Sequence, residues 1–386
     1  MIRVLSQTCF SLFLIVFFTG CTDFVEPNQL AFVVGTAIDH VENGNIEVSH
    51  QIAIPSQMNA PKSGGTGNAD SFFVMTAQGK DVFEATEKIQ RDMSRRLMTS
   101  HRILIAISEE FFNKNDISKL FDKLGRDPAN NQRDITLMIK GSSAKDFLLL
   151  KHPLENLSSI AAGKEIQING MRNFSTRQFI IDNVSEEHRS LVPTFQIKNR
   201  KVNTKKEEPL AIFSGYAILN KNLKVSGLLD DAEGSDVAWI SGKEKSQGLT
   251  ITWKDGTGIL SFRLTHLRSH FQSVSDNDSH RVAVTVRAQA YLLENTTSLD
   301  MSAADNILEV QQYVDEQVQK KLQLTLGKVQ NWGTDVFGIG AYLHRQYPSW
   351  WKSQKEDWDD NFKKVDVTVQ AKILIRSLGT LGGQLK

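Results

Sequence analysis

The sequence predicts an α+β protein of more than one domain, with a mixed α/β N-terminal part, a smaller middle part and a C-terminal antiparallel sheet with helices packed on one face. Three observations support this class. Buried-strand runs alternate with helical periodicities up to about residue 165, short irregular fragments follow, and long period-two runs begin after residue 210. With 386 residues, 40% of them hydrophobic, the chain is long enough for two or three cores.

The start of the chain has the pattern of an export signal. Arg3 precedes an apolar run at residues 9–18, which is shorter than the roughly 20 residues that a transmembrane helix needs. The run ends in Phe18-Thr19-Gly20-Cys21, which resembles a bacterial lipobox. The alternative is an ordinary signal peptide in which the cysteine is incidental. We predict a lipoprotein signal peptide at 1–20, cleavage between Gly20 and Cys21, diacylglycerol on the Cys21 thiol, and a lipidated tether at 21–26.

A lipid anchor would fix where the folded part works. Two acyl chains hold a protein durably on a membrane, and six tether residues extend at most about 20 Å. The chain has two cysteines, Cys9 in the signal and Cys21 at the anchor, so we expect no disulfide. A formal net charge of +1 provides no strong field for nucleic acid, and we predict no nucleic-acid partner.

Residues 27–165 are predicted to form the N-terminal α/β domain. Strands at 30–38 and 46–54 flank a turn at 42–45. The glycine-containing stretch at 55–70 lacks the Gly-Lys-Ser/Thr ending of a phosphate-binding loop, so we interpret it as a mobile loop. The remaining predicted elements are a strand at 72–77, a helix opened by Asp81 and Glu84, a strand at 102–107, a helix at 117–124 closed by Gly125, a strand at 135–139 and a helix at 144–150.

Residues 166–209 form the predicted middle segment, which is less regular. It contains short apolar fragments at 179–181 and 195–197 and then a charged stretch from Lys198 to Glu208. Acidic residues follow the basic ones at once and no aromatic residues lie between them. We therefore interpret the charged stretch as a solvated boundary rather than a nucleic-acid site.

Residues 210–386 are predicted to be the C-terminal α+β domain. Two hairpins are expected, from 210–219 with 224–229 and from 248–254 with 258–265. Arg281 to Leu293 is the clearest alternating strand in the chain. The elements that follow are a helix of about 29 residues opened by Ser302 and Asp305, helices at 335–346 and 349–362, and a final strand at 365–375.

Candidate catalytic and metal-binding groups do not form a known pattern. His266, His270 and His280 lie close in sequence, but the His-Glu-x-x-His form is absent and the segment alternates like a strand. No Gly-x-Ser-x-Gly elbow occurs, and acylation of Cys21 leaves no cysteine nucleophile. We predict neither a metal nor a cofactor.

An acidic and aromatic region near the C-terminus offers a different hypothesis. Asp357, Asp359 and Asp360 beside Trp358 would suit a hydrolase acting on peptidoglycan, and Trp351 with Trp358 would suit sugar stacking. Adjacent acids on a polar helix are more often a solvated face, and tryptophans at helical spacing are more often core or interface. We therefore predict that the protein is not an enzyme.

Several motifs in order along the chain resemble the spore germination lipoproteins of the Ger(x)C family. The lipobox is followed by Asp23, Glu26 and the run Leu30 to Asp39. The later matching residues are His101, Arg126-Asp127-Pro128, Gly215, Gly227, Glu233, Trp239, Gly242-Lys243, Asp335, Phe337-Gly338, His344-Arg345, Pro348, Trp351 and Trp358.

The resemblance implies a non-catalytic subunit of a nutrient germinant receptor. Such a subunit would be lipid-anchored on the outer face of the spore inner membrane, beside an A subunit with soluble and membrane parts and a transporter-like B subunit. It also implies three α/β domains. The alternative from another class is a solute-binding lipoprotein that presents a small nutrient to a transporter, and this would have a polar pocket between domains. A third hypothesis is an anchored wall hydrolase.

Overall fold

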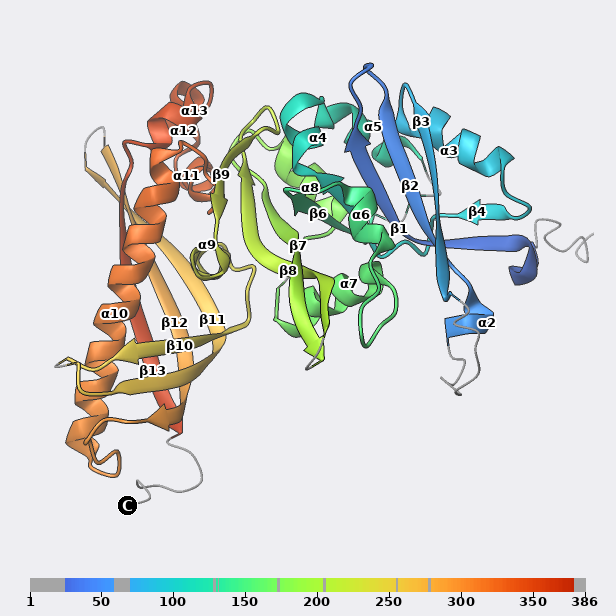
Figure 1. Cartoon of the computed structure of the whole chain (residues 1–386). Helices are drawn as coiled ribbons and strands as arrows, with labels where there is room; N and C mark the ends of the chain where they lie inside the picture. Colours follow the sequence, from blue (N-terminus) through green and yellow to red (C-terminus); the bar gives the residue numbers. More distant parts are fainter. Residues whose placement is uncertain are drawn as a thin grey trace, which may run out of the picture.

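The protein consists of two β-sheets with helices packed against them, and these lie side by side in an elongated molecule (Figure 1). The α+β class is therefore confirmed. The structure is a computed structural model and describes residues 25–58, 70–127, 130, 132–171, 174–203, 206–254, 256–276 and 279–377.

The first sheet contains nine strands among the described residues and has a parallel centre. Strands β1, β5, β6 and β7 run parallel, with antiparallel strands at both ends, in the order β3-β2-β1-β5-β6-β7-β8-β9, and β4 pairs with the start of β1. The predicted pairing of 30–38 with 46–54 is confirmed. The strands are β1 (Leu30–His40), β2 (Ile46–Ala53), β3 (Phe72–Gly79), β4 (Arg96–Met98), β5 (Leu104–Ser108), β6 (Ile135–Lys140), β7 (Leu191–Asn203), β8 (Lys206–Leu219) and β9 (Val225–Leu229).

Helices cover both faces of the first sheet, as the buried character of its parallel strands requires. One face carries apolar side chains of four helices, α3 (Val82–Arg91), α4 (Glu109–Lys114), α5 (Ile117–Arg126) and α8 (Thr176–Val184). The opposite face carries α6 (Ala144–Leu149) and α7 (Ser158–Ile168). The predicted cap of α3 is confirmed, since Asp81 accepts the Glu84 backbone N–H at 2.8 Å.

Two short helices that were not predicted occur in the first domain, one before β1 and one at the start of the predicted loop. A short 3-10 helix, η1 (Pro27–Gln29), leads directly into β1, and the loop predicted from residue 55 begins with a four-residue helix, α2 (Pro55–Met58). Residues 59–69 lie outside the described part.

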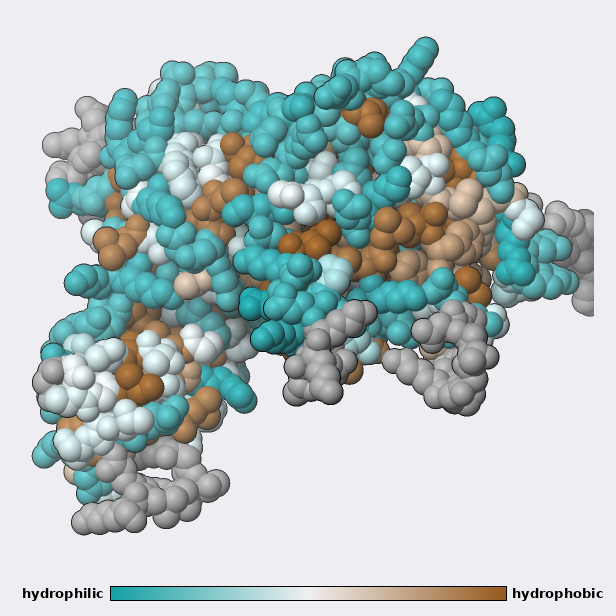
Figure 2. Space-filling model, in the orientation of Figure 1, coloured by the Kyte–Doolittle hydropathy of each residue, from teal (hydrophilic) through white to brown (hydrophobic). Residues whose placement is uncertain are grey.

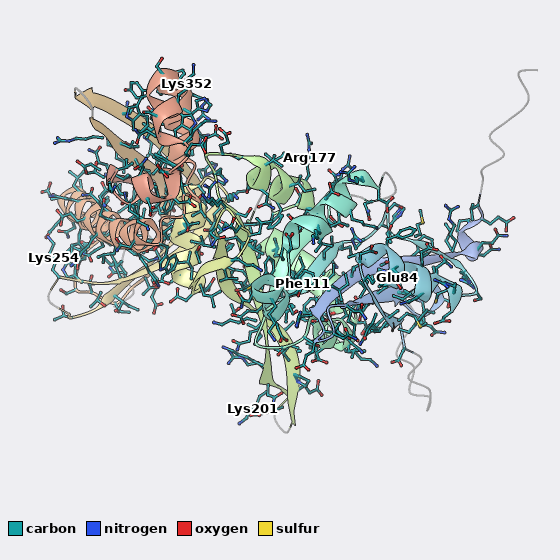
Figure 3. All side chains as sticks on the ribbon, turned by 90° about the horizontal axis from the view of Figure 1, so that it is seen from above. Glu84, Phe111, Arg177, Lys201, Lys254 and Lys352 are labelled. Carbon is teal, nitrogen blue, oxygen red and sulfur yellow. The ribbon has the colours of Figure 1, made fainter. Side chains whose placement is uncertain are left out.

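The predicted solvated boundary at 198–208 is instead the outer part of the β7–β8 hairpin. Arg200 lies opposite Glu208 and Lys201 opposite Glu207, so the basic and acidic runs face each other across two strands. Figure 3 shows Lys201 on this hairpin, away from the body of the molecule. Strand β8 passes through residue 210 without a break, and the predicted hairpin of 210–219 with 224–229 forms as β8–β9 within the first sheet.

The second sheet contains four strands in the order β10-β11-β12-β13. The prediction of an antiparallel sheet is correct for the pairs β10–β11 and β11–β12 but wrong for β12–β13, which are parallel. The reason is the intervening helical segment, which returns the chain to the end of the sheet where β12 began. The strands are β10 (Ser246–Thr252), β11 (Ile259–Asp276), β12 (Ser279–Asn295) and β13 (Asp366–Ser377).

Helix α10 (Ala304–Asn331) packs along one face of the second sheet, as predicted. It begins after Ala303, and the predicted cap Ser302 instead bonds Asp300. Its side chains also cover the outer edge of β13. The acceptors are Gln323 for the Val369 N–H at 2.8 Å, Asp315 for the Ile373 N–H at 2.6 Å and Gln311 for the Ile375 N–H at 3.2 Å. The edge strand is therefore closed to further pairing at these positions.

The C-terminal helices are shorter than predicted. The helix expected from Asp335 starts at Ile339, because Asp335 lies before it and accepts its first backbone N–H groups. The helix expected at 349–362 is two helices that meet near residues 355–357. The observed bounds are α11 (Ile339–Gln346), α12 (Pro348–Gln354) and α13 (Trp358–Phe362).

Candidate functional site

The predicted lipidation and cleavage residues, Cys21 and Gly20, lie outside the described residues. The described chain starts at Val25 and enters η1 and β1 at the end of the molecule farthest from the second sheet (Figure 1). A lipid on Cys21 would therefore be joined by five residues, 22–26, to η1, which leads directly into the first sheet.

The motif residues of the later sequence gather where the two sheets meet. We call this region the junction and define it as the segment 182–190, helix α9 (Asp231–Ile240) with Lys243 and Glu244, and the segment 333–360. One hydrophobic cluster runs through it, joining Tyr216 and Leu229 of the first sheet to α9 and to the core of the second sheet. The two halves are thus packed as one body at this place.

Asp335 organises the C-terminal side of the junction. Its side chain is fully buried and accepts backbone N–H groups from Phe337, Gly338, Ile339 and Gly340 at 2.6–3.2 Å. The indole of Trp358 donates to the same carboxylate at 3.2 Å. Burial raises the pKa of Asp335, while these donors oppose the shift. The carboxylate therefore fixes both the start of α11 and the position of Trp358.

A buried ion pair links the two sides of the junction. Lys243 Nζ lies 3.2 Å from Asp182 of α8, and both side chains are 7% exposed. His188 lies 3.4 Å from the same carboxylate through Nδ1 and 3.1 Å from the Val336 carbonyl oxygen through Nε2. Although burial raises the pKa of Asp182, His188 and Lys243 together hold it below its usual value. Breaking such a pair leaves a buried charge without its partner.

Two further polar contacts cross the junction from residues 187–189. Arg189 donates to Asp359 from Nε at 3.0 Å and from Nη2 at 2.7 Å. Glu187 lies 2.6 Å from His344, whose ring stacks on Trp351 with 5.5 Å between ring centroids. The sequence missed Asp182, Glu187, His188 and Arg189 because they lie in the irregular middle segment; the one available signal was a charged run between two apolar fragments.

Two motif glycines allow close approaches beside the junction. At Gly227, an added Cβ would lie 2.5 Å from the ring of Trp332. At Gly215, φ is +108° and an added Cβ would lie 2.1 Å from the Leu229 carbonyl oxygen. Any other residue would push the strands β8 and β9 away from their partners. These glycines therefore act in packing.

The hypothesis of a sugar-binding or hydrolytic site near residue 358 is not supported by this geometry. Trp351 and Trp358 are each only 1% exposed and contact each other edge to face, which confirms the prediction of core packing. Asp359 pairs with Arg189, and Asp360 pairs with Lys363 at 2.9 Å. The acids are thus divided between separate ion pairs.

The predicted histidine group is only partly described. His266 and His270 are exposed on β11, and His266 has a positive φ of 55° at a register shift in the strand. The side chain of His280 lies outside the described residues. Within the described ranges, no three His, Cys, Asp or Glu side chains are grouped for a metal. In the same ranges, no helix combines the length and apolar composition needed to cross a bilayer.

Glu244 is the strongly perturbed acid of the junction. It is 6% exposed, and burial, with Asp231 and Asp236 nearby, raises its pKa to about 8, although Ser235 opposes the shift. The folded protein therefore keeps a proton that the unfolded chain loses near pH 4.5, and stability falls as pH rises from 4.5 to 8.

The first prediction is that Glu244→Gln stabilises the protein at alkaline pH. At pH 8 the free energy of unfolding should rise by about 2–4 kcal/mol, and the difference from the parent should vanish near pH 4. Urea denaturation between pH 4 and 8 measures this. The exposed Glu316→Gln should follow the parent at every pH. Equal stability of the parent and Glu244→Gln at pH 8 would mean that Glu244 is ionised in the folded state.

The junction can hold two halves of a protein together, and its polar groups are used in doing so. The carboxylates of Asp182, Glu187, Asp335 and Asp359 are paired with cationic side chains, a histidine ring, an indole or backbone N–H groups, whereas Glu244 is bonded to the Ser235 hydroxyl. A cleft of about 910 Å³ lies between α5, α8 and the turn before β9. The surface in Figure 2 is mostly hydrophilic, with hydrophobic patches over the first sheet.

Comparisons with known proteins agree with a chain made of two matched halves. Residues 23–197 match the "Spore germination protein N-terminal domain", and residues 214–379 match "Spore germination B3/GerAC like, C-terminal". The chain is 24% identical over 372 residues to the putative spore germination protein YfkR of Bacillus subtilis (strain 168), covering 96% of each. It is 21% identical to spore germination protein KC of the same organism, covering 100% of this chain and 98% of that one.

A solved structure has a similar fold. The crystal structure of the GerBC protein superposes with a TM-score of 0.55 at 16% identity, covering 91% of this chain and 99% of that chain. The likeness therefore extends over both sheets and the junction between them.

Proposed function

We propose, because the chain belongs to the GerAC-like family of spore germination proteins, that it is a non-catalytic, lipid-anchored subunit of a nutrient germinant receptor. The observation that carries this proposal is the match to spore germination proteins over both halves of the chain. The buried junction supports a role in which the two halves act as one shape for recognition by other subunits.

The proposed anchor orients the molecule on the membrane. Diacylglycerol on Cys21 would hold the chain at the outer face of the spore inner membrane. The five residues 22–26 reach at most roughly 18 Å, so the end of the first sheet near η1 would lie closest to the lipid. The second sheet, at the opposite end in Figure 1, would extend away from the membrane and remain available to the proposed A and B subunits.

The solute-binding alternative requires an open pocket between two lobes. In the described residues, Phe174, Tyr216 and Trp239 fill the junction, and each is at most 6% exposed. This packing favours the assembly role over a two-lobed binding protein.

The second prediction tests the anchor. Cys21→Ala should move the protein from the membrane fraction to the soluble fraction and weaken the germination response, because the acyl chains are its only proposed hold on the bilayer. Cys9→Ala, which changes the other cysteine and leaves the lipobox intact, is the matched control and should stay in the membrane. Unchanged fractionation of Cys21→Ala would reject the anchor.

The assembly itself is tested with a tagged copy of the chain. Isolation from spore membranes in mild detergent should recover an A-type and a B-type subunit with the parent protein. Recovery of the tagged chain without any integral membrane partner would contradict the proposal.

A further inference from the structure

A partly open cavity of about 200 Å³ lies in the first domain, apart from the junction. It is bounded by strands β1, β2 and β5 on one side and by helices α3 and α5 and strand β4 on the other. The surrounding core on this face is apolar and includes Ile38 and Ile105. A cavity of this volume admits only a small solute.

The floor of the cavity is polar, although it lies in the centre of a hydrophobic layer. Thr36, His50 and Arg102 line it and are 2%, 1% and 5% exposed. His50 bonds the Thr36 hydroxyl at 3.0 Å through Nδ1, and its Nε2 lies 3.4 Å from the Thr86 hydroxyl. Thr36 lies on β1, His50 on β2 and Arg102 in the segment just before β5. Burying three polar side chains together costs free energy unless each one is hydrogen-bonded.

Arg102 has strong acceptors on only one side. Its Nε and Nη2 lie 2.7 and 2.6 Å from Asp134 Oδ2, which is behind the cavity floor. Its other contacts are long, at 3.5 Å from Nη1 to the Thr36 hydroxyl and 3.4 Å from Nη2 to the Asn130 side-chain oxygen. The guanidinium group can therefore donate to a stronger acceptor on the cavity side.

A second cation, Lys123 of α5, also lines the cavity. It is 26% exposed and lies 3.2 Å from Asp127 at the rim, where Arg96 and Glu87 are also found. Burial, together with the positive charges of Arg102 and Lys123, lowers the pKa of His50 to about 3, so the imidazole is neutral at physiological pH. The cavity is thus lined by the neutral imidazole of His50, by the hydroxyls of Thr36 and Thr86, and by the cationic groups of Arg102 and Lys123.

We propose that this cavity binds a small carboxylate-bearing solute, with the carboxylate between Arg102 and Lys123 and close to the hydroxyls of Thr36 and Thr86. A carboxylate accepts hydrogen bonds on both oxygens and suits the planar guanidinium group. The site requires neither the lipid anchor nor the partner subunits, so it can be tested on the isolated chain.

The test is a titration of the detergent-solubilised full chain with sodium acetate and with glycine, against sodium chloride at equal ionic strength. Saturation-transfer difference NMR, which detects weak binding, gives the dissociation constant. Lys123→Met and Thr86→Val should each weaken binding, the first by about tenfold or more because it removes a charged contact. Lys119→Met, an exposed lysine one turn earlier on α5, should bind as the parent does.

Three outcomes would overturn the proposal. These are no saturable signal from either carboxylate, equal loss of binding in Lys119→Met and Lys123→Met, or tighter binding of inorganic phosphate than of acetate. Denaturation curves of each variant verify that it is folded. Because the anchor is tested by fractionation and the site by solute binding, each can fail without the other.

Discussion

Replacing Asp335 with Ala is expected to lower the free energy of unfolding by about 3–5 kcal/mol. The substitution leaves the backbone N–H groups at the start of α11 without their acceptor, in a fully buried place. It also removes the acceptor of the Trp358 indole, so the packing of Trp358 against Trp351 should loosen. Urea denaturation followed by tryptophan fluorescence measures both effects.

The matched control for this prediction is another aspartate that caps a helix but is exposed. Asp116 accepts the Ser118 N–H at 3.0 Å at the start of α5, and Asp116→Ala should cost only about 1 kcal/mol. Asp335→Asn keeps one acceptor oxygen, so its loss in free energy of unfolding should lie between the losses of Asp335→Ala and Asp116→Ala. If Asp335→Ala is no more costly than Asp116→Ala, the buried carboxylate does not organise the junction.

Replacing Lys243 with Met is expected to cost about 3 kcal/mol and to uncouple the two halves of the protein. Asp182 would keep His188 at 3.4 Å but lose the buried ammonium group that links α8 to the segment after α9. All six tryptophans lie at residue 239 or later, so their fluorescence reports the second sheet and the junction, whereas far-UV circular dichroism reports both halves in full. In the parent protein the two unfolding transitions should coincide.

In Lys243→Met the two transitions should separate, because the contact that joins the halves is weakened while each sheet keeps its own core. The matched control is Lys254→Met, since Lys254 forms an exposed ion pair with Glu309 at 3.0 Å. That substitution should change stability by less than about 1 kcal/mol and leave the transitions coincident. Coincident transitions in Lys243→Met would show that apolar packing alone couples the halves.

The sequence correctly predicted those helices and strands whose pattern is set by residues close together in the chain. The alternation in Arg281 to Leu293 correctly predicts β12 and its buried face, and the spacing of apolar residues from Ile307 to Val329 predicts α10. The cap at Asp81 likewise follows from residues three positions apart. In each case the residues that decide the structure are neighbours in the chain.

The sequence correctly predicted strand pairs joined by short turns, such as β1–β2 and β8–β9, but it did not predict the pairing of strands that are far apart in the chain. A period of two in β13 is the same whether its neighbour is parallel or antiparallel, so the predicted antiparallel sheet is wrong at this pair. The pattern at residue 210 looked like a new domain because β8 follows a charged hairpin end, yet β8 pairs with β7 and β9 in the first sheet.

The sequence by itself determined the long regular elements such as β12 and α10 with their buried sides, the family resemblance and the predicted acylated cysteine, because these depend on residues close together in the chain. Only the tertiary structure decided that Asp182 meets Lys243, that Arg189 meets Asp359, and that Thr36, His50 and Arg102 surround one cavity. Along the chain, Asp182 and Lys243 are 61 positions apart, Arg189 and Asp359 are 170 apart, and Thr36 and Arg102 are 66 apart. No local periodicity specifies which of such distant side chains come together in the folded protein.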